Sequence, residues 1–194
     1  MENVNLNNLS QEEKERHILS LIKNKKTREK GYALLISEFS GRIYWQIRRM
    51  VYSHEDTDDL VQEVFIKVFE NIETFNKKSK LSTWIFSIAY NHTLNFLKSK
   101  TYRNSKKNSS FEQNVLASLE ADSLFDADKA TLTLEKAVLS LPVKQRAVFQ
   151  MRYYQDLSFA QIAQITKTSE GALKASYHIA AEKIEKLVLQ ESNI

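Results

Sequence analysis

Apolar residues recur at helical spacing through most of the first half of the chain. The clearest stripe lies within residues 31–51, where apolar side chains return every three or four positions. Similar patterns predict helices over residues 58–72 and about 82–99, and a weaker one over residues 17–22. The first half is therefore predicted to be a helical bundle.

The pattern fades after residue 102 and resumes near residue 132. Residues 103–130 are mainly polar and predict a flexible linker, with one loose turn at about residues 115–119. The chain holds only 3 glycines and 1 proline, so few tight turns are expected. The sequence therefore predicts an all-α fold of two small helical domains, residues 1–107 and 131–194, joined by a linker over residues 108–130.

The second block has the spacing of a helix-turn-helix. Ser158 and Gln161 fit the capping-box pattern at the start of a short helix, and residues 166–168 predict a turn. A longer helix is expected from about Ser169. Its inward stripe is Leu173, Tyr177, Ala180, Ile184, Leu187 and Val188. DNA binding and plain core packing both explain this spacing.

Composition narrows the classes of function. The 194 residues are 42% hydrophobic and 27% charged, with no apolar run of about 20 residues to cross a membrane. Residues 1–11 are polar and do not predict a secretory signal, so a cytoplasmic location is expected. The absence of cysteine excludes disulfides and thiol chemistry.

The net charge of +4 is unevenly distributed. Residues 1–107 carry 19 basic and 13 acidic side chains (+6), residues 108–130 carry 1 and 5 (−4), and residues 131–194 carry 8 and 6 (+2). Two basic blocks flanking an acidic segment agree with a polyanionic partner, but solvated helical surfaces often have the same balance.

The helix predicted over residues 58–72 has two contrasting faces. One broad face is apolar and predicts core packing: Leu60, Val61, Val64, Phe65, Val68, Phe69 and Ile72. The opposite face is acidic around one large apolar residue: Asp59, Gln62, Glu63, Ile66, Glu70 and Glu73. This outer face is either solvated with a stray isoleucine, or a docking face for a basic partner with Ile66 as its anchor.

The next predicted helix is rich in aromatic residues and follows a basic loop. Its aromatic residues are Trp84, Phe86, Tyr90 and Phe96, and Phe75 introduces the loop. Cations interleaved with aromatic rings suit single-stranded nucleic acid, because bases stack on rings while cations hold phosphates. For Trp84 and Phe96 a core position is the simpler interpretation.

Signals of catalysis or metal binding are missing from the sequence. The three glycines are too scattered for a phosphate-binding loop, and the four histidines have no paired ligand spacing. The acidic cluster of Asp56, Asp58 and Asp59 lacks the spacing of a calcium loop and is typical of a first helical turn. We therefore expect no enzyme activity, no cofactor, no metal and no small-molecule substrate.

Several segments, taken together, resemble extracytoplasmic function (ECF) sigma factors of the sigma-70 family. HEDTDDLVQEVFIKVF (residues 54–69) resembles their region 2.2, and LSTWIFSIAYN (residues 81–91) resembles regions 2.3 and 2.4. LPVKQRAVF, LSFAQIA and SEGALK (residues 141–149, 157–163 and 169–174) resemble region 4. The resemblance covers about residues 17–189, in family order.

The resemblance implies three sites. Core RNA polymerase, through the clamp helices of its largest subunit, would bind the outer face formed by Asp59, Gln62, Glu63 and Ile66. Flipped bases of the melted −10 element would contact Phe75, Lys77, Lys78, Lys80, Ser82 and Asn91. The −35 element of promoter DNA would contact the recognition helix through Gly171, Lys174, Ala175, Ser176 and His178. Such proteins open DNA through binding energy, and the polymerase makes the bonds.

The resemblance also leaves departures and rival functions. Family members often carry arginines along the recognition helix, where this chain has Ser176, Ile179 and Ala181, and a glycine in the turn, where it has Thr166. An anti-sigma protein is a further partner known for the family. A stand-alone helix-turn-helix regulator and a helical scaffold protein remain alternatives from the residues alone.

Overall fold

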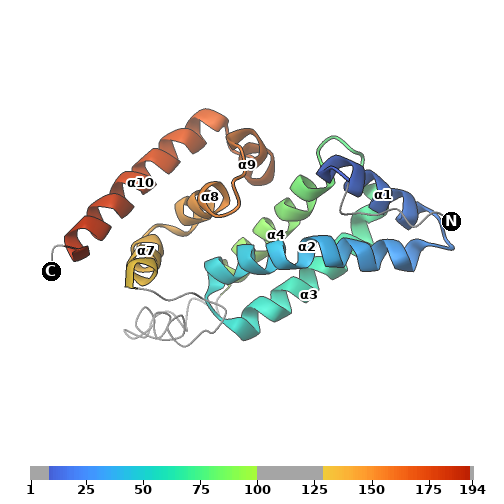
Figure 1. The fold of residues 1–194 in the computed structure, drawn as a ribbon, viewed down its shortest axis with the longest axis horizontal. Coiled ribbons are helices and arrows are strands. Elements are labelled where there is room, and N and C mark those ends of the chain that lie inside the picture. Colours follow the sequence, from blue (N-terminus) through green and yellow to red (C-terminus); the bar gives the residue numbers. More distant parts are fainter. Residues whose placement is uncertain (1–8, 100–128, 193–194) are drawn as a thin grey trace.

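The computed structural model describes residues 9–99 and 129–192, and within these ranges every regular element is a helix (Figure 1). The N-terminal half contains α1 (Gln11–Lys23), α2 (Arg28–Val51), α3 (His54–Asn71), the short 3-10 turn η2 (Ile72–Thr74) and α4 (Leu81–Lys98). The C-terminal half contains α7 (Lys129–Leu139), α8 (Val143–Tyr153), α9 (Phe159–Thr166) and α10 (Glu170–Ser192). The predicted all-α class is confirmed. The turn predicted at residues 115–119 lies outside the described residues.

Two helices begin earlier than the apolar pattern indicates, because capping residues lie before it. Ser10 and Glu13 form a capping box, in which the Ser10 N–H donates to Glu13 Oε2 (2.8 Å), so α1 begins at Gln11. Ser53 accepts a hydrogen bond from the N–H of Asp56 (3.2 Å), so α3 begins at His54.

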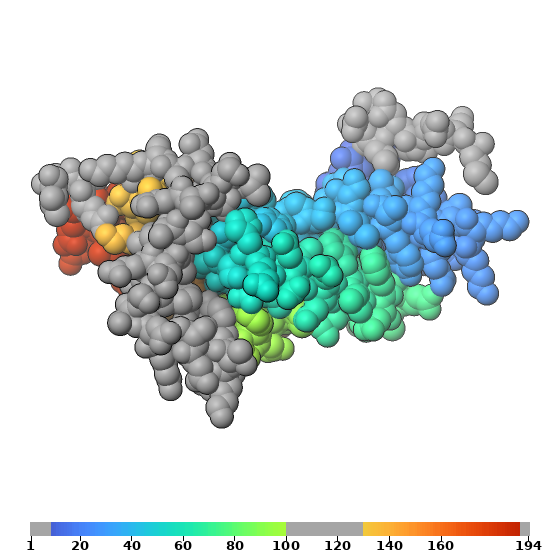
Figure 2. Space-filling view, turned by 90° about the horizontal axis from the view of Figure 1, so that it is seen from below, coloured from blue at the N-terminus to red at the C-terminus, as the bar shows by residue number. Residues whose placement is uncertain are grey.

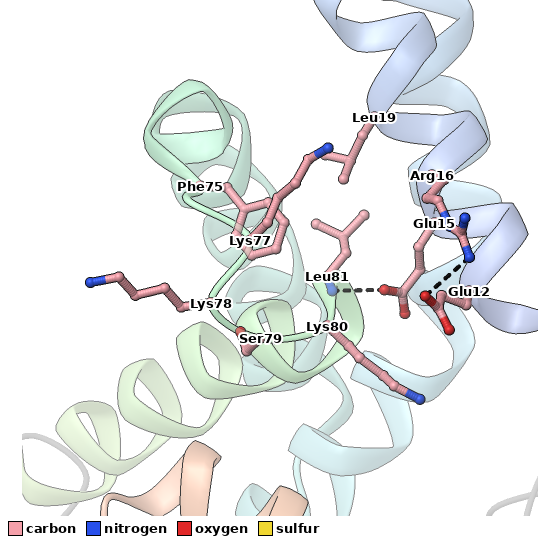
Figure 3. A pocket seen from close by; sticks show the side chains of 10 residues that line it. All are labelled: Glu12, Glu15, Arg16, Leu19, Phe75, Lys77, Lys78, Ser79, Lys80 and Leu81. Carbon is pink, nitrogen blue, oxygen red and sulfur yellow. Dashed lines mark hydrogen bonds and ion pairs between the residues drawn. The ribbon is translucent and has the colours of Figure 1, made fainter.

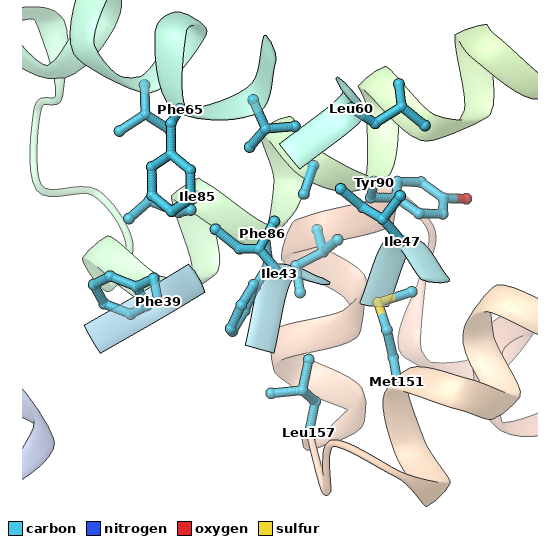
Figure 4. Packing of buried hydrophobic residues seen from close by; sticks show 14 of the residues in the cluster. Phe39, Ile43, Ile47, Leu60, Phe65, Ile85, Phe86, Tyr90, Met151 and Leu157 are labelled. Carbon is cyan, nitrogen blue, oxygen red and sulfur yellow. The ribbon is translucent and has the colours of Figure 1, made fainter. Parts of the chain in front are cut away.

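The core of the N-terminal half forms around α2. The predicted stripe of this helix is buried at Leu35, Phe39, Ile43 and Ile47, each 0% exposed. The apolar faces of α3 and α4 close over it (Figure 4). Their buried contributors include Leu60, Val64, Phe65, Val68, Ile85, Phe86 and Ala89. The predicted inward face of residues 58–72 is thus confirmed.

The C-terminal half has a smaller core of its own. Helices α7 and α8 pack against α10, whose predicted inward stripe is buried at Leu173, Ala180 and Ile184. The buried cluster comprises Ala137, Val138, Leu141, Phe149, Ala180 and Ile184. Pro142 directly precedes the first residue of α8, where its missing N–H is not needed.

The two halves also pack against each other. Helix α9 lies against α4, and α8 lies against α2. Met151 and Leu157 reach into the core of the N-terminal half (Figure 4). Gln150 Nε2 donates to the carbonyl oxygen of Arg49 (2.7 Å), and the Arg49 guanidinium lies 3.9 Å from the ring centre of Tyr154. The sequence pattern did not predict this contact, which joins residues about a hundred positions apart.

Candidate functional site

The predicted docking face lies on the exposed side of α3. Asp59, Gln62, Glu63 and Ile66 are all exposed, and the Ile66 side chain is 55% exposed although it is large and apolar. Figure 2, which views the molecule from below, shows this part of the chain, in teal, exposed near the centre of the view. The four residues therefore form one continuous acidic surface with an apolar centre.

One acid of this face is tied to α4. Glu63 Oε2 and His92 Nε2 form a hydrogen-bonded pair, in which the His92 side chain is largely buried and Glu63 remains accessible. The sequence pattern left His92 without a partner, because the two residues are 29 positions apart. The pair therefore fixes the position of the Glu63 carboxylate relative to α4.

The basic loop between η2 and α4 is exposed and anchored at its start. Lys77, Lys78 and Lys80 are exposed. Phe75 packs against Trp84 with their ring centres 5.2 Å apart. Lys77 has a left-handed backbone (φ 59°), and the N–H of Lys78 donates to Asn76 Oδ1 (3.2 Å). The loop therefore presents three ammonium groups beside an aromatic pair.

A hollow of about 380 Å³ lies between this loop and α1 (Figure 3). Glu12, Glu15 and Arg16 line its α1 side, and the loop lines the other. Arg16 donates to Glu12 at 3.1 Å. The hollow thus combines a basic wall, an aromatic ring and an acidic wall that the sequence pattern did not associate with the loop.

Ser82 does not lie on this surface. Its residue is only 6% exposed, and its backbone N–H donates to Glu15 Oε1 (3.2 Å). The expectation that Ser82 contacts DNA is corrected, because the first turn of α4 is covered by α1.

Asn91 lies on the exposed strip of α4. Its Nδ2 donates to the carbonyl oxygen of Ser87 (2.8 Å) within the same helix. It lies ten positions after Leu81, the first residue of α4, which is about 15 Å along the helix axis. Asn91 is therefore accessible and is not part of the loop around Phe75.

Helices α9 and α10 form the predicted helix-turn-helix. Ser158 and Gln161 make both hydrogen bonds of the capping box, so that prediction is confirmed. Lys167 closes α9 with a left-handed backbone (φ 56°, ψ 38°). The residue in the conformation that favours glycine is thus Lys167 and not Thr166, which ends the helix.

The outward face of α10 carries the predicted recognition residues. Gly171, Lys174, Ala175 and His178 are exposed. Ser176 is half-buried, and its carbonyl oxygen accepts a hydrogen bond from Gln145 Nε2 (3.2 Å). The face has little positive charge, because His178 pairs with Glu182 at 3.3 Å.

Residues 9–99 and 129–192 were also compared with the requirements of a metal site and of a membrane-spanning helix. These residues contain no group of three His, Asp or Glu side chains placed to hold a metal ion. No helix among them is long and apolar enough to cross a membrane.

Two family models match this chain, one in each half. Sigma-70 region 2 matches residues 35–103, and sigma-70 region 4 matches residues 131–184. The chain therefore belongs to the sigma-70 family of RNA polymerase sigma factors, which are regulatory and non-catalytic proteins.

Curated relatives place the chain among the ECF sigma factors. It is 26% identical over 170 residues to the ECF RNA polymerase sigma factor SigW of Bacillus subtilis, a match that covers 84% of this chain and 91% of SigW. It is 28% identical over 165 residues to the ECF RNA polymerase sigma-E factor of Haemophilus influenzae, covering 81% and 87%.

Solved structures share the fold. CnrH, in complex with the cytosolic domain of CnrY, aligns with a TM-score of 0.66 at 14% identity and covers 90% of this chain and 97% of CnrH. RpoE of Bartonella quintana, in complex with the anti-sigma factor NepR, aligns with a TM-score of 0.59 at 18% identity, covering 82% and 97%.

Proposed function

We propose that this sigma factor directs core RNA polymerase to promoters through three separate surfaces. The outer face of α3 docks on the polymerase, the loop before α4 with Asn91 reads the −10 element, and α10 reads the −35 element. The observation that carries the proposal is the exposed Ile66 among the acidic and polar residues of α3, within the segment that the sigma-70 region 2 model matches.

The docking face has the composition of a binding hot spot. A large apolar side chain at the centre supplies the desolvated anchor, and the surrounding acids steer a basic partner. The His92 pair keeps Glu63 oriented before binding, which lowers the entropy lost on association. The clamp helices of the polymerase's largest subunit are the partner that the family resemblance implies.

The loop surface suits a base that has left the duplex. Its lysines attract phosphates, and the hollow behind it is about 380 Å³, large enough to admit one nucleobase. Stacking on aromatic side chains contributes about 1–3 kcal/mol per base in such sites. Phe75, Lys77, Lys78, Lys80 and Asn91 are the candidates for these contacts, and Ser82 is not.

The −35 surface should bind weakly by itself. Lys174 is the main free cation on the exposed face of α10, because His178 is paired with Glu182. Lys174→Ala should lower promoter affinity of the holoenzyme and reduce the slope of log affinity against log salt by about one unit. Nitrocellulose or fluorescence binding over a salt series measures this slope, and an unchanged slope would remove Lys174 from the phosphate contacts.

We propose a division into two domains, residues 1–107 and 131–194, with a linker over 108–130. This division would let one molecule bind the −10 and −35 elements at the same time. The two elements lie roughly 25 base pairs apart, or about 85 Å of duplex at about 3.4 Å per base pair. In the structure α9 contacts both α4 and α10, so the two halves are packed against each other. We infer that the halves separate on the promoter, so that each reaches its own element.

We also propose an anti-sigma protein as a partner, since two structural neighbours, CnrH and RpoE, were solved with such regulators or partner domains bound. The site of action would be the cytoplasm, where core polymerase and DNA are found.

Run-off transcription tests the proposed function. Purified chain should give core-dependent, promoter-specific transcripts, and Glu63→Lys or Ile66→Asp should reduce them by weakening core binding, without unfolding the protein. A stand-alone regulator would bind DNA without core polymerase but would give no new transcript. A scaffold protein would neither bind DNA nor give a transcript. Either result would reject the sigma assignment for this chain.

A further inference from the structure

A buried carboxylate connects the first helix to the candidate −10 loop. Glu15 lies in α1 and is only 5% exposed. A glutamate is rarely this buried unless its carboxylate has a partner. It lies outside the sigma-70 region 2 match, which begins at residue 35. The matched family region therefore does not include it.

The carboxylate caps α4. Glu15 Oε2 accepts a hydrogen bond from the backbone N–H of Leu81 (2.7 Å), and Oε1 accepts one from the N–H of Ser82 (3.2 Å). Figure 3 shows the Glu15 side chain reaching across the hollow to the start of the helix. The N-cap residue, Lys80, cannot do this, because a lysine side chain has no acceptor.

This arrangement satisfies two needs of α4 at once. The first turn of a helix has free N–H donors, and a negative charge there interacts favourably with the helix dipole. Hydrogen bonds to an ionised acceptor are about twice as strong as neutral ones. An anion supplied from 66 positions away therefore fixes where α4 begins.

The same contact fixes the end of the basic loop. The loop starts at Phe75, held by its packing against Trp84 and by its N–H bond to Ile72 (3.2 Å). It ends at Lys80, one residue before the N–H that Glu15 holds. With both ends held, the intervening lysines occupy a defined path along the hollow.

We propose that Glu15 is a positioning residue for −10 recognition: by capping α4 it holds the basic loop in the shape that accepts a promoter base. This inference rests on the proposed function of the loop. It adds α1, through the hydrogen bonds of one side chain to the start of α4, to the machinery that sets −10 specificity.

The close packing of α1 supports this role. At Gly31 in α2, an added Cβ would lie 2.7 Å from Ile22 Cγ1 and 2.8 Å from the Ile22 backbone nitrogen, so only glycine permits this close approach. Arg28 binds the carbonyl oxygen of Ile22 (3.1 Å) and also Glu73 beside the loop (2.9 Å). Helix α1 is thus fixed against both α2 and the loop base.

The test uses the full chain with one reporter on the loop. Because the chain has no cysteine, Ser79→Cys creates a single site for a spin label within the loop. Glu15→Ala removes both acceptors, Glu15→Gln keeps one acceptor oxygen without the charge, and Glu29→Gln, an exposed acid on α2, is the matched control. Label mobility, core affinity and transcription from single-base −10 variants are measured for each.

Glu15→Ala should mobilise the label and reduce discrimination between −10 variants about tenfold, the effect of leaving buried donors unpaired. Core affinity and binding of a −35 duplex by holoenzyme should not change. Glu15→Gln should be intermediate, and Glu29→Gln should match the parent. The ratio between promoter variants is the decisive readout, because a smaller folded fraction lowers all transcripts equally and leaves the ratio unchanged.

Three results would overturn the inference. The first is unchanged label mobility in both Glu15 variants, and the second is a mobile label with unchanged discrimination between −10 variants. The third is a loss of transcript that is explained fully by a smaller folded fraction. If Glu15→Ala does not fold, Glu15→Gln decides alone by the same criteria. Failure of the proposed function is distinguishable, since the parent chain would then give no core-dependent transcript whatever the label reports.

Discussion

The two halves of this protein bury their apolar residues in different ways. In the N-terminal half, α2, α3 and α4 enclose a core that includes Phe39, Ile43 and Val64, each 0% exposed. In the C-terminal half, only the cluster around Phe149 and Ile184 is internal. Its other buried apolar residues, among them Met151 and Ile162, merge with the N-terminal core. The first half is self-contained, and the second depends on the first.

The polar groups between the halves differ from those of the docking face. Arg146 Nε and Gln150 Oε1 are buried with no hydrogen-bond partner among the described residues. A partly satisfied polar network stabilises an interface less than a fully paired or apolar one. We therefore expect the contact between the halves to open more readily than the core of the N-terminal half.

The largest effect should follow from a cavity in the N-terminal core. Phe39→Ala should lower the free energy of unfolding by about 4 kcal/mol, because a buried ring is lost and its space is only partly refilled. Amide hydrogen exchange should show lost protection in both halves. Phe149→Ala is the matched variant and should affect α7, α8 and α10 only, and equal losses from both variants would contradict the asymmetry.

A charge in the contact between the halves should open it. Met151→Asp places an unpaired carboxylate at a position that is 1% exposed, which should disfavour the closed arrangement by about 3 kcal/mol. Fluorophores on cysteines introduced at exposed Lys25 and Leu189 should then move apart. Ile179→Asp, on the exposed face of α10, is the control and should leave their separation unchanged.

The docking face should tolerate substitution without loss of fold. Ile66→Asp should weaken binding to core polymerase by about 2 kcal/mol, some thirtyfold, because the central apolar anchor is replaced by a charge. Ile36, another exposed isoleucine, supplies the control variant Ile36→Asp. Equal core affinity of the two variants, measured by titration of labelled protein, would move the docking site away from α3.

The smallest effect should be a dependence of the stability of the C-terminal half on pH. Burial raises the pKa of Glu135 above its ordinary value, partly offset by the hydrogen bond from Tyr154 and by the nearby Arg49, Tyr52 and Arg146. A raised pKa in the folded state gives stability that is complete below the ordinary pKa and is lost as pH rises through the raised value.

Replacement of this acid should remove the dependence. Glu135→Gln keeps an acceptor for the Tyr154 hydroxyl and should stabilise α7–α10 by about 1 kcal/mol above the raised pKa, because no charge is then buried. The slope of unfolding free energy against pH is measured by denaturant unfolding across a pH series, with amide hydrogen exchange in α7 as the local probe. Glu185→Gln, at an exposed site on α10, should keep the parent's slope.

The sequence by itself determined the helices and their faces. Apolar residues at a period near 3.6 gave the buried stripes of α2, α3 and α10, and the polar residues opposite them gave the exposed candidates around Ile66 and Lys174. The capping box at Ser158 was also readable. These features are local, because a helix places residues three and four apart on one face whatever surrounds it.

Only the tertiary structure decided what meets across those faces. The burial of Ser82, the cap that Glu15 provides for α4, the pair between Glu63 and His92 and the contact of Met151 with the first half all join separate helices. The apolar pattern shows that a face is buried but not which helix covers it. That choice depends on the angles and close approaches of packed helices, such as the one that Gly31 permits between α1 and α2.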